Sequence, residues 1–145
     1  MSKALFITDQ DLKRFSIISG NVDDDKLIQF ISIAQDIHIQ NYLGTPLFEK
    51  FETEIIAGTL ANPYLALMND YVKNMVIHWS MVEILPFIAY TVAAKGIFKH
   101  TSENSEVVSK SEVDYLVARH RDIAENYTRR FIDYMCYNST TFPEY

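Results

Sequence analysis

The sequence predicts an all-α fold, a compact bundle of about five helices. Apolar residues recur at helical spacing in several long segments. The chain has only four glycines and four prolines in 145 residues, which is few for a loop-rich all-β protein. Hydrophobic residues make up 48% of the chain, enough for a sizeable core. We therefore expect one helical domain over residues 1–138, followed by an extended tail over residues 139–145.

The first two helices are predicted from capping residues and charge. Residues 8–11, TDQD, form a variant of the capping box and open a short helix that ends near Ser16. Three consecutive aspartates, residues 23–25, place negative charge where the helix dipole favours it. They therefore mark the start of a second helix, which ends at Leu43.

The stretch NYLGTPLFEKF, residues 41–51, predicts a sharp corner between the second and third helices. Gly44 can adopt the left-handed conformation that ends a helix. Thr45 can cap the next helix, and Pro46 suits its first position because its φ is already fixed. We expect this third helix to end before Gly58.

The longest apolar segment opens at Asn62 and Pro63. It is predicted to be helical to Lys95, with a kink or break at Pro86, and to end at Gly96. Its part MVIHWSMVEILPFIAYTVAA is long enough to cross a bilayer. However, it carries Glu83 near its centre, and a central carboxylate costs about 3 kcal/mol on insertion scales. We expect a helix buried by other helices rather than a membrane span.

Residues 97–110 have no helical apolar stripe and are rich in Ser, Glu and Lys. They are predicted to form a non-helical excursion or a β-hairpin, with IFKH and EVVS as weak strands. Ser111 then caps the last helix, whose apolar residues fall within about one third of the helical circle. This helix ends near Tyr137 and is followed by the tail STTFPEY.

Composition and charge argue against several classes of protein function. The net charge of −6 argues against a general nucleic-acid binder, because phosphate contacts need a basic face. The single Cys136 cannot form an intramolecular disulfide, which fits a reducing compartment. Only four consecutive apolar residues, 4–7, lie near the N-terminus, too few for a signal peptide.

The pattern of titratable residues predicts no enzyme, no metal and no cofactor. Neither Glu-x-x-His nor His-x-x-x-His occurs, so His38 and His120 are interpreted as hydrogen-bonded core histidines. Glu83, flanked by apolar residues, is a possible buried charge with two interpretations. It pairs with an Arg or Lys or faces a subunit boundary, or it is a general base with a raised pKa. No nucleophile motif or phosphate-binding loop accompanies it.

Four of the five arginines lie on the last helix: Arg119, Arg121, Arg129 and Arg130. Helical geometry places Arg119 and Arg130 at one edge of the apolar stripe and Arg121 and Arg129 on the other side of the helix. The four therefore do not form one phosphate-reading row. They form either a solvated face with salt bridges or a contact with an acidic partner surface.

Four stretches of the chain resemble the head–tail connector, or neck adaptor, proteins of tailed bacteriophages. They are the early helix leading into NYLGTPLFEKF, the apolar central helix through Pro86, the helix end at residues 94–97 with its polar excursion, and the last helix with its Tyr-rich end and FPEY. The resemblance implies a structural subunit of a closed ring, commonly of twelve copies. Such a ring lies under the portal and passes the DNA channel to the next neck or tail component.

The resemblance further implies a location in the virion neck, after assembly in the cytoplasm of the infected bacterium. DNA is then only passing cargo, and no membrane is involved. We expect the excursion to reach a neighbouring subunit or the channel, and the last helix and tail to dock on the portal. The predicted partner interface comprises Arg119, Arg121, Arg129, Arg130, Phe142, Pro143 and Tyr145.

The sequence also allows two rival functions. One is a small helical adaptor or regulatory interaction module, monomeric or dimeric, that uses the tail as a docking motif. The other is an enzyme that uses Glu83 together with a histidine, for which the sequence names no substrate.

Overall fold

The computed structural model describes residues 3–14, 24–99 and 110–145, and all regular structure in these ranges is helical. The all-α prediction is therefore confirmed for the described chain. The helices form five continuous runs: α1 (Asp9–Arg14), then α2 (Asp24–Ala34) with η1 (Gln35–Ile39) and α3 (Gln40–Leu43), then α4 (Thr45–Ala57), then α5 (Tyr64–Leu67) with η2 (Met68–Val72) and α6 (Lys73–Lys99), and finally α7 (Lys110–Tyr137). Both η segments are single π-helical turns.

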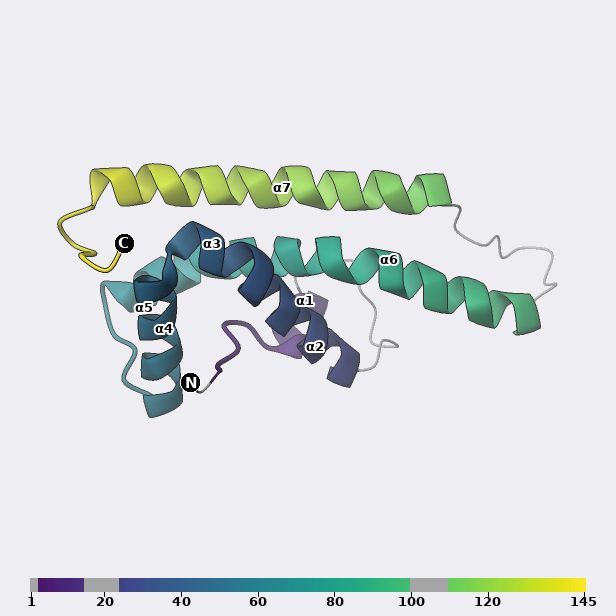
Figure 1. Ribbon diagram of the computed structural model, residues 1–145, viewed down its shortest axis with the longest axis horizontal. Helices are drawn as coiled ribbons and strands as arrows, with labels where there is room; N and C mark the ends of the chain where they lie inside the picture. Colours follow the sequence, from purple (N-terminus) through teal and green to yellow (C-terminus); the bar gives the residue numbers. More distant parts are fainter. Residues whose placement is uncertain (1–2, 15–23, 100–109) are drawn as a thin grey trace.

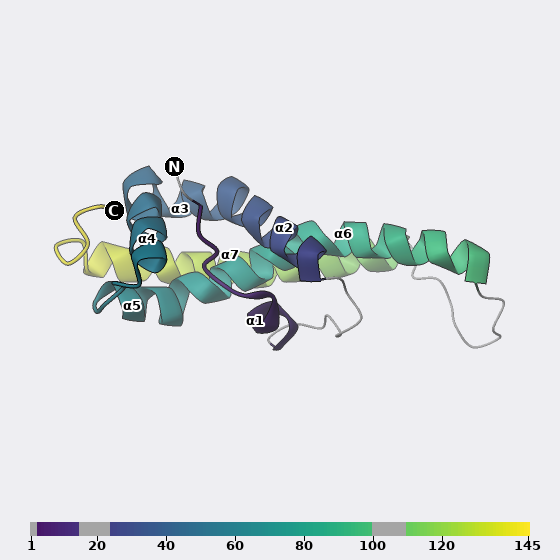
Figure 2. The same ribbon diagram turned by 90° about the horizontal axis from the view of Figure 1, so that it is seen from below.

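Helices α6 and α7 lie side by side, antiparallel, and set the long axis of the molecule (Figure 1). The α2–α3 run packs against α6. Helix α4 stands across one end of the molecule, where α5 and both chain termini also lie (Figures 1 and 2). No described helix is long and apolar enough to cross a membrane.

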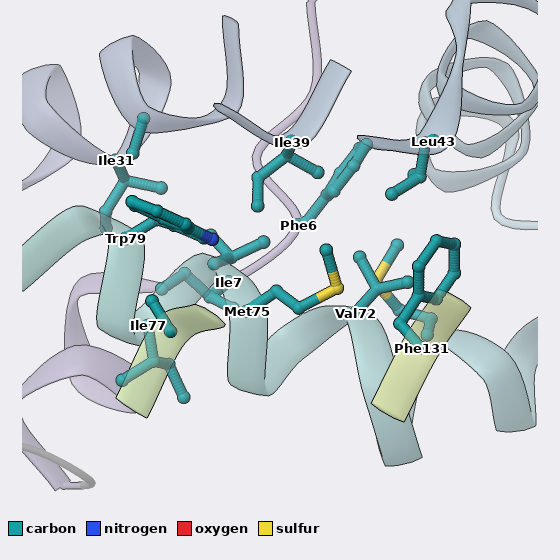
Figure 3. Packing of buried hydrophobic residues seen from close by; sticks show 14 of the residues in the cluster. Phe6, Ile7, Ile31, Ile39, Leu43, Val72, Met75, Ile77, Trp79 and Phe131 are labelled. Carbon is teal, nitrogen blue, oxygen red and sulfur yellow. The ribbon is translucent and has the colours of Figure 1, made fainter. Parts of the chain in front are cut away.

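The core lies where the α2–α3 run, α4, α6, α7 and the N-terminal segment meet. Figure 3 shows Met75 and Trp79 of α6 beneath Ile31 and Ile39. Phe6 and Ile7 enter this core from the segment before α1, although that segment is not helical. The core therefore joins residues from both ends of the chain.

The predicted corner after Leu43 is present, with a different assignment of roles. Gly44 has φ 80° and separates α3 from α4, and Gly58 has φ 70° and ends α4. Such positive φ values favour glycine because a Cβ atom is strained there. Thr45 is the first residue of α4 rather than its cap, and its hydroxyl accepts a hydrogen bond from Gln40 at 3.3 Å.

The predictions for the course of α6 and for the segment that connects it to α7 were partly wrong. Helix α6 continues through Pro86 and Gly96 to Lys99, so there is neither a break at Pro86 nor an end at Gly96. A helical glycine costs only about 1 kcal/mol relative to alanine, which a 27-residue helix tolerates. Residues 97–99 and Lys110 are helical rather than part of an excursion or hairpin. The rest of the predicted excursion, 100–109, lies outside the described residues.

Candidate functional site along helices α6 and α7

Glu83, the possible buried charge, lies on α6 and is partly exposed, with a side-chain exposure of 29%. Its Oε1 atom lies 2.8 Å from Nε2 of His38. Among the described residues Glu83 therefore pairs with a histidine of η1 rather than with the predicted Arg or Lys, and the alternative that it faces a subunit boundary stays a prediction. The predicted core histidine at position 38 is hydrogen-bonded, as expected.

A π-helical turn orients His38 toward α6. The imidazole of His38 stacks on Trp79, with ring centroids 4.2 Å apart and an interplanar angle of 16°. The indole Nε1 of Trp79 donates to Thr128 Oγ1 at 3.1 Å, and that hydroxyl donates to the carbonyl of Ala124 at 2.8 Å. One continuous set of polar and aromatic contacts therefore links η1, α6 and α7. Such π turns are frequent at functional positions in helices.

A second histidine contact lies between α6 and α7. The Nδ1 atoms of His78 and His120 are 3.3 Å apart, and the ring of Tyr127 stacks on His78 with centroids 5.4 Å apart. Burial and the neighbouring His120 lower the pKa of His78 to about 4. Burial and the charge of Arg119 lower the pKa of His120. Both rings therefore tend to be neutral near pH 7.

The described residues contain no group of three or more His, Cys, Asp or Glu side chains arranged to hold a metal ion. Glu83 lies in a pair with His38, and the second histidine contact involves His78 and His120. The two contacts lie on either side of Trp79 in sequence along α6.

The four arginines of α7 are exposed. Within residues 3–14, 24–99 and 110–145, no ion pair joins Arg119, Arg121, Arg129 or Arg130 to an Asp or Glu. The guanidinium of Arg130 lies 6.0 Å from the ring centroid of Tyr127. Among the described residues the salt bridges expected of a solvated face are therefore not seen, and both the solvated face and the partner interface stay predictions.

The C-terminal tail folds back onto the helices rather than extending away from them. Phe142 is fully buried and contacts the ring of Tyr64, with centroids 5.2 Å apart. Glu144 accepts a hydrogen bond from the Tyr64 hydroxyl and lies 3.8 Å from the Lys50 ammonium. Burial and this hydrogen bond raise the pKa of Tyr64 to about 12.

Phe142 is thus not free for a partner, which corrects the prediction of a tail without core contacts. Its aromatic ring packs in the apolar core of the protein, and this burial stabilises the fold. Pro143 is exposed and Tyr145 is 45% exposed while its ring contacts Phe131. Only these two of the three predicted tail residues lie at the surface.

The family described as a family of unknown function (DUF6712) matches residues 39–145. The chain belongs to the DUF6712 family. No curated protein and no solved structure matches it. The DUF6712 match includes Glu83, the His78–His120 contact, the arginines of α7 and the tail, whereas His38 lies just before it.

Sequence reasoning missed the side chains that hold the N-terminal segment. The Gln35 amide accepts from Phe6 N at 2.7 Å and donates to Ala4 O at 2.9 Å. Glu52 accepts from Ala4 N at 3.1 Å. The one sequence signal for this role is the position of Gln35, directly after Ala34 on the apolar face of the second helix.

Proposed function

We propose that this DUF6712 chain is a structural protein of the virion neck, a head–tail connector subunit. Copies of it form a ring around the DNA channel, between the portal and the next neck or tail component. The proposal rests on the sequence resemblance and on one structural observation. The observation is the exposed surface of α7, where four guanidinium groups have no carboxylate partner among the described residues.

Arginines in such a position suit a protein partner with carboxylates on its surface. The planar guanidinium forms paired hydrogen bonds with a carboxylate, and arginine is enriched in protein interfaces. Two tyrosines of the same helix are also exposed, Tyr115 at 69% and Tyr137 at 90%. Tyrosine and arginine together are the residues that most often dominate binding energy.

The same surface does not suit the DNA duplex. The arginines of α7 alternate with exposed carboxylates, Asp122, Glu125 and Asp133. A phosphate backbone binds a continuous basic face, and a mixed face repels part of it. The net charge of −6 adds to this repulsion. An acidic ring through which DNA passes without being held fits both facts.

A ring also needs two different surfaces on each subunit, because a head-to-tail contact joins unlike patches. Helix α7 offers the charged surface. The α2–η1 run offers an apolar one, with Ile33 exposed at 40% and Ile37 at 49%. The two surfaces belong to different helices, so each subunit presents unlike patches, as a head-to-tail contact needs.

Native mass spectrometry and light scattering over a range of concentrations test this proposal, with the chain alone and with the portal protein of the same phage. We expect a closed ring of about twelve subunits in at least one of the two conditions, visible by negative-stain microscopy. A stable dimer in both conditions, without portal binding, would overturn the proposal. That outcome would favour a small helical adaptor module.

A further inference from the structure

We propose that His78 and His120 form a two-histidine binding site for a divalent transition-metal ion, with zinc as the best-suited one. The site lies between α6 and α7, and water completes the coordination of the metal. It is independent of the proposed neck function. The spacing in the sequence could not reveal it, because the two residues lie 42 positions apart on different helices.

The distance between the two ring nitrogens matches a chelating geometry. Zinc bound tetrahedrally at about 2.0–2.1 Å from each nitrogen would hold two ligand nitrogens about 3.3–3.4 Å apart. The two Nδ1 atoms lie 3.3 Å apart. Without a metal, the same separation allows a hydrogen bond between the two nitrogens, and a bound metal would displace its proton. The separation of the two nitrogens therefore suits a single metal ion that both bind.

The protonation of the rings also suits a metal. A histidine binds metal through the lone pair of a neutral ring nitrogen. Burial lowers the pKa values of both rings, so protons compete weakly for these lone pairs near pH 7. The Nε2 atoms are not among the buried polar atoms that lack a partner in the described residues. With Nδ1 as the metal ligand, the remaining ring hydrogen of each histidine is on Nε2.

The surroundings of the pair set the expected strength of binding. Tyr127 covers one side of His78 by stacking, which fixes the orientation of that ring. The positive charge of Arg119 acts on His120 and opposes a cation. Only two protein ligands are present, whereas structural zinc sites have four. We therefore expect one weakly bound metal per chain, displaced by EDTA, that joins the two long helices at one point.

Zinc chloride titration of the full chain, followed by calorimetry and by the thermal unfolding midpoint, tests this site. The wild type should bind one zinc ion per chain, and zinc should raise the unfolding midpoint. The variants His78→Gln and His120→Gln should each weaken binding at least tenfold and abolish this rise. The matched variant His38→Gln changes the histidine paired with Glu83 and should bind zinc as the wild type does. So should His100→Gln.

The variant Arg119→Gln is expected to strengthen zinc binding rather than weaken it. It keeps both ligands and removes the opposing charge, so zinc should bind several-fold more tightly than to the wild type. X-ray absorption of the zinc-loaded wild type should show two imidazole nitrogens with oxygen as the remaining ligands, a readout that needs no variant. Absence of saturable zinc binding, or equal binding by wild type and His120→Gln, would overturn the proposal.

Discussion

The two halves of α7 lie in different surroundings. In the C-terminal half, Ala124, Phe131 and Met135 are fully buried, and Thr128 is 4% exposed. In the N-terminal half, the most buried side chains are those of Val113 at 9% and His120 at 8%, and Tyr115 is 69% exposed. The C-terminal half therefore belongs to the core together with α4, α5 and the tail, whereas the N-terminal half contributes less to the core.

One half of α7 therefore stabilises the fold, and the other half leaves its side chains accessible to a partner. Burial of large apolar side chains stabilises the fold, and it makes the same side chains inaccessible to a partner. The tail is an example, since its one fully buried residue, Phe142, packs at the C-terminal end of α7 and is inaccessible to a partner. Residues that serve a partner are then expected on the outward side of α7, where charges lack partners within the described chain.

The largest expected effect is that of Phe142→Ala at the core end. Removing a fully buried phenylalanine leaves a cavity between Tyr64 and Tyr134 and should lower the free energy of unfolding by about 3–5 kcal/mol. Urea unfolding followed by circular dichroism measures it. The matched variant Tyr137→Ala, at a residue 90% exposed, should change stability by less than about 0.5 kcal/mol. Equal stability of the two variants would remove the distinction between a buried tail and an exposed helix end.

The next effect is that of Gln35→Ala, which concerns the N-terminal segment. The substitution leaves Phe6 N and Ala4 O without their partner, and an unpaired buried polar group costs about 1–3 kcal/mol. Gln29, exposed on the same run, serves as the matched control in Gln29→Ala. Hydrogen exchange of the Phe6 amide should accelerate only in the Gln35 variant. Unchanged exchange would show that the Gln35 hydrogen bonds do not hold this segment in place.

A smaller effect concerns pH, at the boundary between the two halves of α7. The pKa of His78 in the folded chain, about 4, lies below the ordinary value of 6.5. The unfolded chain therefore binds more protons between these values, and stability must fall as pH drops from 6.5 toward 4. Above pH 7 this group contributes no pH dependence.

Nuclear magnetic resonance titration of the imidazole C–H signals, in EDTA, measures this pKa directly. His78→Gln identifies the signal and should flatten part of the decline in stability between pH 6.5 and 4. A His78 signal that titrates near pH 6.5 would show that water reaches the ring freely in the folded protein.

The sequence predicted the helices that local patterns determine. Gly58 and the corner at Gly44 were predictable, because helix ends with positive φ favour glycine. The extent of α6 beyond Gly96 was not, since a single glycine lowers helix propensity without ending a long helix. Burial of Phe142 was also not predictable, because a tail of seven residues has no periodicity that reveals packing.

The partners of the polar side chains on α6 could not be predicted from the sequence, for a different reason. Glu83 was recognised as an unusual charge, yet its partner His38 lies 45 residues away and faces it only through a π-helical turn. The approach of His78 to His120 likewise depends on how α6 and α7 align. Side-chain pairs between distant helices follow from tertiary packing, which periodicity alone does not specify.

The most direct test of the proposed function combines stability and assembly in one variant, Arg119→Ala with Arg121→Ala, Arg129→Ala and Arg130→Ala. The free energy of unfolding should stay within about 0.5 kcal/mol per site of the wild type, since these side chains are exposed. Native mass spectrometry with and without the portal protein should show that ring assembly or portal binding is lost. A variant that assembles and binds the portal as the wild type does would contradict the role assigned to the exposed side of α7.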